Sequence, residues 1–544
     1  MTGILQHIKS FCESTSVKGV PKITKSPTRG LGALWLFAVL FCAACCCIQV
    51  GDIVSRYLSH PRVTLVKEEQ ISILNGNNMA DLEFPHIIVC NLNLMSADVS
   101  ERQDMIDFPK RYYNEVIKWT TCPSCTPEQN ELLMKLRRFY YTTHGFYSLS
   151  NLSAMQSFAI PAGQLISSCK ALVLTNLELQ KLPCEEFADL SILALPDAFN
   201  CVNIKAKPPY RSFMPLVGFE FVMYLDDLGP EMPLYFNEGS TSAYLTGGKV
   251  TIYKPGTIPL PERDGIYLSP GYYNDVKLEV EAWKRLPAPY SQCSLNKTVL
   301  DAYKFDGNTV RYNSDTCLGI HVAKKIEEIC GCRDSFSFVT VSTKYSDLGA
   351  LPQCVEPTDP KIMAERYNCT LHIRKIATSA LSSRCHEGCH ETYYRSFNSQ
   401  TQWTSKKYLS RIYKEHVENT SYAWRFDKND ETKLLQQIKD NFVSLKVMLS
   451  TRKYIKFQEE PAYTASYMVS SLGGALNLWL GITVILVVEV IDYILKVFLV
   501  SNDKKQTAPS GSDHKQTEIT KNGNNPGFSN EYVSEYGMDV VKKN

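Results

Sequence analysis

Two long apolar segments lie near opposite ends of this 544-residue chain, and they constrain its fold more than any other feature. The first, residues 31–50, lies in an uncharged run of 22 residues whose helix would span roughly 33 Å, about the hydrocarbon thickness of a bilayer. The second, residues 472–500, contains three ionisable residues: Glu489, Asp492 and Lys496. Ionisable groups at membrane depth indicate a polar pathway. The pattern predicts a two-pass membrane protein with a large domain between the spans.

Charge around the first segment predicts its orientation. Five basic residues precede it: Lys9, Lys18, Lys22, Lys25 and Arg29. By the positive-inside rule they keep the N-terminus in the cytosol, and two crossings return the C-terminus there. A secretory signal is the alternative, but the apolar run is too long for one. Gln49, Asp52 and Arg56 also follow it, in place of a small-residue cleavage site.

These observations divide the chain into five parts. We expect a cytosolic N-terminus (1–29), a first transmembrane helix (30–51), an extracellular domain (52–465), a second transmembrane helix (466–500) and a cytosolic tail (501–544). The tail is poor in aliphatic residues and rich in polar ones, a composition typical of disorder. The expected location is the plasma membrane.

Cysteines and glycosylation sequons agree with this topology. Of 19 cysteines, five lie before or within the first span, which leaves an even number, 14, in the predicted ectodomain. An oxidising compartment would form up to seven disulfides from them. The four usable N-x-Ser/Thr acceptors also lie there: Asn151, Asn296, Asn368 and Asn419.

The ectodomain pattern predicts an α+β fold built on an antiparallel sheet. Short β-rich runs (218–224, 249–253, 276–280 and 442–449) alternate with helical runs at 127–140 and 405–418. The formal net charge of +2 gives no sign of nucleic-acid binding.

Three motifs carry a resemblance to a known family. Phe84-Pro85, followed by Cys90-Asn91 and Asn93, resembles the FPxxxxCNxN signature of the superfamily of degenerins, epithelial sodium channels and acid-sensing channels. A block of eight cysteines from Cys293 to Cys389 follows its order. The second span matches its pore helix. The resemblance implies a trimer with a finger, thumb and palm type of ectodomain, as a homotrimer or with related subunits, and it implies neither chemistry nor a cofactor.

The resemblance also implies a disulfide pairing. The implied pairs are Cys90 with Cys201, Cys169 with Cys184, Cys293 with Cys389, Cys317 with Cys385, Cys330 with Cys369 and Cys332 with Cys354, which leaves Cys122 and Cys125 as a local bridge. Acid-sensing members carry one further bridge. Both of its positions are replaced here, by His321 and Ser383.

In this family the second span is interrupted at a Gly/Ser-x-Ser filter, and the matching tripeptide is Gly481-Ile482-Thr483. Extended backbone there would present carbonyl oxygens to a cation. Three copies of Glu489 and Asp492 would form acidic rings at the inner mouth. Ser470 and Ser471 precede Gly473 and Gly474, glycines that allow close helix approach. The resemblance therefore implies sodium conduction through residues Ser471, Gly481, Ile482, Thr483, Glu489 and Asp492.

Gating residues follow from the same resemblance. The family's pre-span His-Gly motif is Lys18-Gly19 here, so the turn-permitting glycine is kept while a group that titrates near neutral pH is lost. Gating through this site should therefore be less sensitive to cytosolic acid. Ser470 occupies the degenerin position, where a bulky residue should hold the gate open. Tyr290 matches the aromatic at the thumb base that would press on the first span.

The gating stimulus is read from the ectodomain. The chain most resembles the FMRFamide-gated sodium channels of invertebrates, which predicts an amidated neuropeptide ligand. Candidate contacts are five finger aromatics and three acids: Phe139, Tyr140, Tyr141, Phe146, Tyr147, Glu185, Glu186 and Asp189. The alternative is that these aromatics are core and the acids a solvated face. Residues 228–238 lack the paired carboxylates of proton-gated members, although Asp226 and Asp227 lie just upstream. A proton-gated or constitutively open channel is the alternative function.

One motif points to a different class. His386-Glu387-Gly388-Cys389-His390 is a literal H-E-x-x-H, the zincin signature, and would make the protein a membrane-anchored zinc ectoenzyme. That motif needs a stable helix. Gly388 weakens one, and Cys385 and Cys389 belong to the disulfide block, so a disulfide-pinned loop is the favoured interpretation.

Overall fold

The computed structural model describes residues 9–71, 82–93, 107–149, 160–176, 178–195, 198–213, 215–227, 246–296, 303–305, 308–334, 342–343, 351–381 and 383–506. It divides into two compact units, Ser55–Tyr467 and the two chain ends, Met1–Val54 with Met468–Asn544. The predicted ectodomain limits, residues 52 and 465, lie close to these divisions. Each unit is considered separately.

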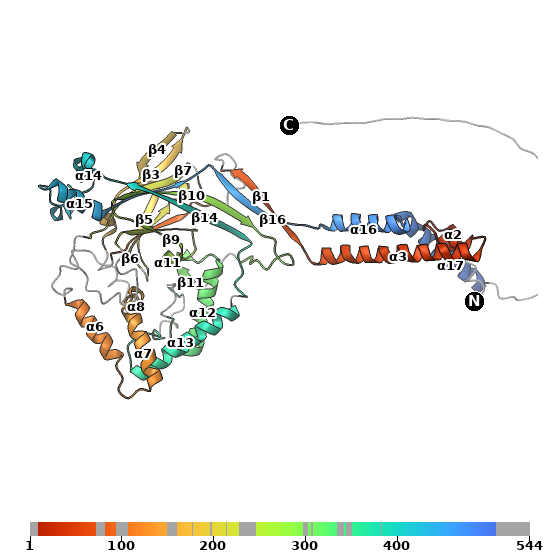
Figure 1. Cartoon of the computed structure of the whole chain (residues 1–544), viewed down its shortest axis with the longest axis horizontal. Helices are drawn as coiled ribbons and strands as arrows, with labels where there is room; N and C mark the ends of the chain where they lie inside the picture. Colours follow the sequence, from red (N-terminus) through yellow and green to blue (C-terminus); the bar gives the residue numbers. More distant parts are fainter. Residues whose placement is uncertain are drawn as a thin grey trace, which may run out of the picture. The chain divides into compact units, whose positions relative to one another are not determined.

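The central unit contains an eight-stranded sheet, the palm (Figure 1). Its strand order is β1 (Arg62–Gln70), β16 (Lys453–Pro461), β10 (Tyr272–Lys284), β15 (Phe442–Leu449), β7 (Leu216–Tyr224), β3 (Ile166–Thr175) and β4 (Glu178–Pro183), and β14 (His390–Gln402) pairs with β10 off this path. The predicted antiparallel sheet is only partly right, because β10 pairs in parallel with β15 and β16. Strands β15 and β16 pair with successive parts of β10, residues 273–278 and 281–284, and both run in the same direction as β10.

A second sheet packs on the palm. Its order is β5 (Ala188–Leu195), β6 (Ala198–Ala206), β2 (His86–Asn91), β8 (Gly248–Tyr253) and β9 (Gly265–Leu268), all antiparallel. Strand β2 covers the middle of the FPxxxxCNxN motif, with Phe84 and Pro85 before it and Asn93 after it, and Ile87 to Asn91 are all buried. One hydrophobic core joins Ile87 and Val89 of β2 to Phe219 and Phe221 of β7. A minor sheet joins β12 (Asn308–Thr309), β11 (Tyr303–Phe305) and β13 (Ser342–Thr343).

Helices form two groups beside these sheets (Figure 1). The finger helices are α6 (Phe108–Trp119), α7 (Pro127–Tyr140) and α8 (Thr143–Leu149), and the thumb helices are α12 (Ser314–Cys330) and α13 (Pro360–Leu381). Helices α14 (Leu409–His416) and α15 (Glu431–Asn441) lie elsewhere. Helix α7 begins where the sequence predicts, because Thr126 and Gln129 form a capping box around Pro127. Short elements α10 (Ala162–Leu165), α11 (Pro261–Asp264), η1 (Cys184–Glu186), η2 (Pro208–Tyr210), η6 (Lys406–Tyr408) and η7 (Ala423–Arg425) complete the unit.

The terminal unit holds the two apolar segments. Helix α3 (Arg29–Leu58) follows the short α2 (Val20–Thr24) and is long and apolar enough to cross a membrane. The second segment forms α16 (Ala465–Leu480) and α17 (Val484–Gln506), which pass the same test only as a pair and are bent by 73° at their junction. The described residues therefore contain one candidate span, or two if the bent pair is one span.

Candidate pore and gating site

The second apolar segment is interrupted at Gly481-Ile482-Thr483, the tripeptide to which the resemblance assigns the filter. Gly481 has φ +66°, in the left-handed region that favours glycine. Its N–H still donates to Asn477 O (3.0 Å), whereas the N–H of Ile482 donates to Leu476 O (3.2 Å). The helix therefore ends at a residue whose backbone conformation no β-branched residue would adopt easily.

The segment before α3 lies against this break. Its chain turns at Gly19, with φ +94°, and the N–H of Lys18 donates to Leu480 O (3.1 Å). A Cβ added to Gly481 would lie 2.7 Å from Cγ of Lys18, so the aliphatic stem of Lys18 packs directly on that glycine. The sequence pointed to Lys18 and Gly481 separately but gave no signal that they touch.

Two further contacts fix the pre-span segment to α17. The N–H of Ser16 donates to Glu489 Oε2 (3.1 Å), and the rings of Phe11 and Tyr493 lie 4.8 Å apart. Glu489 is therefore engaged by backbone within its own subunit, which the prediction of a simple acidic ring did not include. Asp492 lies one turn further on and is exposed.

Helix α16 carries the remaining pore candidates. Ser470 is exposed and Ser471 half-buried. A Cβ added to Gly473 or Gly474 would meet nothing within 4 Å, so the close helix approach predicted for these glycines does not occur within one subunit. The contact between α16 and α3 that the structure does show is a hydrogen bond from Trp479 Nε1 to Gln49 Oε1 (2.6 Å).

The described residues form seven disulfides, six at the pairs that the resemblance implies and the seventh between the two remaining cysteines, Cys122 and Cys125. Those of the thumb join α12 and α13 and the loops beside them. His321 lies close to Cys317 and Cys385, but these sulfurs are bonded to each other and are not free metal ligands. Burial, then the charges of Lys324 and Arg384, lowers the pKa of His321.

The zincin hypothesis is wrong. Residues 385–389 are not helical, and His390 is the first residue of β14, so the two histidines do not lie one helical turn apart. Glu387 is paired with Arg285 (2.5 Å). The stretch is a loop held by the disulfides of Cys385 and Cys389.

Most of the predicted peptide-stacking aromatics belong to the finger core. Tyr140, Tyr141 and Phe146 are between 0% and 4% exposed, and Tyr140 donates a hydrogen bond to Val355 O. Burial raises the pKa of the Tyr140 hydroxyl far above its ordinary value. Phe139 is half-buried at the edge of this cluster, and the side chain of Tyr147 lies outside the described residues. The cluster packs α7 on the thumb, so three of the predicted ligand contacts are corrected to core positions.

The predicted acidic contacts have a different environment. Glu185 and Glu186 lie in η1 and Asp189 in β5, and all three side chains are exposed. Lys207 already approaches them, 3.9 Å from Asp189 and hydrogen-bonded to Glu185 O. The glycosylation candidates Asn296, Asn368 and Asn419 are also exposed, and Asn151 lies outside the described residues.

Asp226 and Asp227 follow the end of β7. Asp226 is buried and accepts a hydrogen bond from the hydroxyl of Tyr224 (2.9 Å). Burial, followed by the neighbouring charges of Asp440 and Asp226, raises the pKa of Asp227 above its ordinary value. Residues 228–238, where the proton-gating carboxylates were sought, include only positions outside the described chain.

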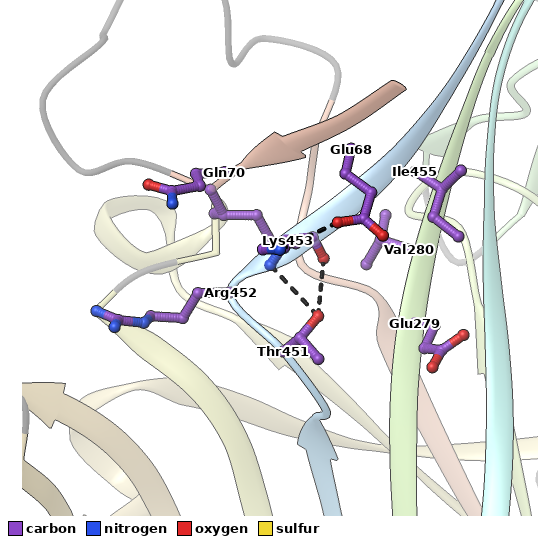
Figure 2. A pocket seen from close by; sticks show the side chains of 9 residues that line it. Glu68, Gln70, Glu279, Val280, Thr451, Arg452, Lys453 and Ile455 are labelled. Atoms are coloured by element: carbon purple, nitrogen blue, oxygen red, sulfur yellow. Dashed lines mark hydrogen bonds and ion pairs between the residues drawn. The ribbon is translucent and has the colours of Figure 1, made fainter. Parts of the chain in front are cut away.

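A cavity of about 490 Å³ opens in the palm between β1, β10 and β16 (Figure 2). Acidic and basic side chains line it, and Lys453 Nζ lies 3.0 Å from Glu68 Oε2. Its lining comes from strands that are far apart in the sequence, so sequence patterns did not reveal it.

At the thumb base, Tyr290 is half-buried, and its ring lies edge-on to that of His60 with the ring centres 5.3 Å apart.

Comparison with known proteins assigns the family. Residues 11–493 match the sequence model described as amiloride-sensitive sodium channel. The chain belongs to this family, which groups ion channels and not enzymes.

Individual relatives are distant. The FMRFamide-activated amiloride-sensitive sodium channel of Cornu aspersum is 21% identical over 92% of this chain and 84% of its own length. Acid-sensing ion channel 4-B of Danio rerio is 22% identical over 94% of this chain and 80% of its own length. Degenerin mec-10 of Caenorhabditis briggsae is 22% identical over 62% of this chain, but the match spans only 43% of the degenerin.

Proposed function

We propose that this chain is one of three subunits of a sodium-selective, amiloride-blocked cation channel in the plasma membrane. Both termini lie in the cytosol, and an extracellular amidated neuropeptide opens the pore. The observation that carries the proposal is the interruption of the second apolar segment at Gly481, with the Lys18–Gly19 turn packed on it. Non-helical backbone at membrane depth is tolerated where it lines water.

Ion passage would use the residues of this break. Residues Gly481, Ile482 and Thr483 of three subunits would surround the narrowest point, and Ser471 would line the outer approach. Thr483 keeps the hydroxyl of the family's filter serine and adds a methyl group. Glu489 and Asp492 would concentrate cations at the inner mouth, with Glu489 also holding the pre-span segment through Ser16.

The acidic residues in η1 and at the start of β5 would bind a cationic peptide. Their exposed carboxylates, Glu185, Glu186 and Asp189, can pair with an arginine side chain. The relative activated by FMRFamide is similar along most of its length, which supports a peptide of that type. Expression in oocytes with FMRFamide, other amidated peptides and acid tests the proposal. An amiloride-blocked sodium current evoked by peptide is expected, and current evoked by acid alone would contradict peptide gating.

A bulky residue at the degenerin position should hold the pore open. Ser470 is exposed on α16, before the break, and we expect Ser470→Trp to raise the resting amiloride-blocked current at least fivefold. The matched control is Val469→Trp, at the neighbouring exposed position, which should leave resting current near the wild-type level. Resting current that is equal in the two variants would contradict the alignment of this segment.

Acid should loosen the ectodomain around α14, whatever the gating stimulus. His416 is 8% exposed, between Trp403 and Phe442, and burial lowers its pKa. Nearby Glu415 opposes this shift and Lys170 adds to it. Since an unfolded histidine takes up a proton near pH 6.5 and buried His416 does so only at lower pH, the free energy of unfolding should fall as pH drops below about 6.5.

Thermal unfolding of the purified protein at pH 7.5 and pH 5.5 measures this effect. His416→Gln should show a smaller drop in melting temperature than the wild type over that interval. His372→Gln, at an exposed position of α13, is the control and should match the wild type. Equal pH dependence in all three proteins would show that His416 is not the group responsible.

A further inference from the structure

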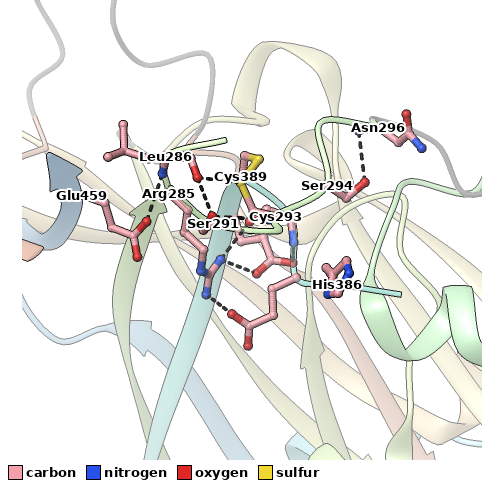
Figure 3. Close-up of a disulfide and its surroundings, with 12 residues drawn as sticks. Arg285, Leu286, Ser291, Cys293, Ser294, Asn296, His386, Cys389 and Glu459 are labelled. Carbon is pink, nitrogen blue, oxygen red and sulfur yellow. Dashed lines mark hydrogen bonds and ion pairs between the residues drawn. A yellow bond between two sulfur atoms is a disulfide. The ribbon is translucent and has the colours of Figure 1, made fainter. Parts of the chain in front are cut away.

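One carboxylate of the central unit joins three segments that are far apart in the sequence (Figure 3). Glu459 lies near the end of β16, and its side chain is only 7% exposed. Its Oε2 accepts a hydrogen bond from the backbone N–H of Leu286 (3.0 Å). Its Oε1 lies 3.4 Å from Nε of Arg62, the first residue of β1. Both oxygens are therefore engaged, one by the thumb-base loop and one by β1.

The thumb-base loop, residues 285–293, is fixed firmly on its thumb side (Figure 3). The Cys293–Cys389 disulfide closes it, and the N–H of Arg285 donates to Cys389 O (2.8 Å). The guanidinium of Arg285 donates to Gly388 O (2.9 Å) and to Glu391 (2.8 Å). A disulfide and a network of charged hydrogen bonds thus fix the loop to residues 388–391, so that the loop and these residues should move together.

On its other side the loop meets the strands that border the two apolar segments in the sequence. Strand β1 follows α3, and β16 precedes α16. Strands β1 and β16 pair from Arg62 opposite Pro461 onward, and Glu459 stands opposite Thr64. Tyr290 touches His60, and Glu459 holds both Leu286 and Arg62. Of these two contacts, the ring contact of Tyr290 with His60 is uncharged, whereas the contact of Glu459 involves a charged group and directional bonds.

The charge makes this contact sensitive to loss of a partner. A buried carboxylate is stable only while hydrogen-bonded or paired, and bonds to a charged acceptor are stronger than neutral ones. Arg62 is 45% exposed, so its ion pair alone would stabilise little. Its contact is with Oε1, while Oε2 accepts from the N–H of Leu286.

We propose that Glu459 is a positioning residue for gating. It transmits displacement of the thumb-base loop to β1 and β16 together. Through these strands the displacement reaches both apolar segments, because α3 precedes β1 and α16 follows β16. The inference rests on the proposed channel function and deepens it, because it names the acceptor through which the loop and the two strands move as one.

Hydrogen exchange on the purified full-length protein tests the three-way contact without any current. Glu459→Gln should accelerate exchange of the Leu286 amide at least tenfold, since its single oxygen would have two donors. Arg62→Gln should accelerate the same amide several-fold, although the described residues show no hydrogen bond between Arg62 and Leu286. The double variant should equal Glu459→Gln. The control is Glu460→Gln, whose partner is Gln458, and it should match the wild type.

Additive effects of the two substitutions on the exchange rate, or an Arg62→Gln variant that leaves the exchange of the Leu286 amide unchanged, would show that the three segments do not form a single contact.

The gating role is tested with FMRFamide as the probe. Glu459→Gln should raise the half-maximal FMRFamide concentration at least threefold at equal surface protein, and Glu460→Gln should not. An unchanged half-maximal concentration would overturn the gating role. A wild-type chain that carries no current under any stimulus would overturn the channel proposal, while the exchange measurements still decide the contact.

Discussion

Replacing Gly481 with alanine is expected to lower the amiloride-blocked sodium current at least tenfold while protein remains at the cell surface. Gly481 has φ +66°, where an L side chain costs about 1–2 kcal/mol. The added Cβ would also lie 2.7 Å from Cγ of Lys18. Relief requires movement of the break or of the pre-span segment. Since about 1.4 kcal/mol is tenfold in an equilibrium, the conducting arrangement should become a minor state.

Two further variants separate the causes. Gly51→Ala changes a glycine of α3 that has helical backbone and nothing within 4 Å of an added Cβ, so its current should stay within twofold of the wild type. Lys18→Ala combined with Gly481→Ala removes the close contact but not the backbone cost, and should recover part of the current. A wild-type current from Gly481→Ala alone would show that this backbone does not limit ion flow.

Removing the Cys90–Cys201 disulfide should prevent the ectodomain from folding stably. This bond joins β2 to β6, both cysteines are at most 1% exposed, and the sequence separation is 111 residues. In the chain-entropy description, closing a loop of that length stabilises the fold by about 5 kcal/mol. Domains have only about 5–15 kcal/mol in total. We expect Cys90→Ser with Cys201→Ser to abolish mature surface protein, measured by surface biotinylation and glycan maturation.

The Cys122–Cys125 disulfide provides the matched comparison. It spans 3 residues at the start of α7 and should contribute only about 2 kcal/mol by the same relation. The corresponding double serine variant should reach the surface at reduced or normal levels. Equal loss from both double variants would contradict loop length as the property that sets the effect.

Sequence reasoning succeeded where the determinant is local. The capping residues Thr126 and Gln129 fix the start of α7. The runs predicted as strands all lie within β7, β8, β10 and β15, since apolar, β-branched residues in short runs fit a buried sheet. The interruption at Gly481 was expected from the family resemblance, and the left-handed backbone there is one that glycine favours.

It failed where the determinant is a long-range contact. The parallel pairing of β10 with β15 and β16 depends on where those strands dock, which their composition does not encode. The aromatics around Tyr140 look the same in the sequence whether they face a ligand or a core, and only packing against Val355 and Met363 decides the matter. The contact of Lys18 with Leu480 joins opposite ends of the chain and leaves no periodic trace.

The pairing of β1 with β16 has a consequence for biosynthesis. Arg62 pairs opposite Pro461, so β1 has no partner strand until nearly all of residues 62–461 have been synthesised. Until then β1 lacks its partner strand and can pair with other chains, and such late pairing makes folding slow. Chaperones of the secretory pathway should therefore bind the nascent subunit at β1, and subunits truncated before β16 should be retained and degraded.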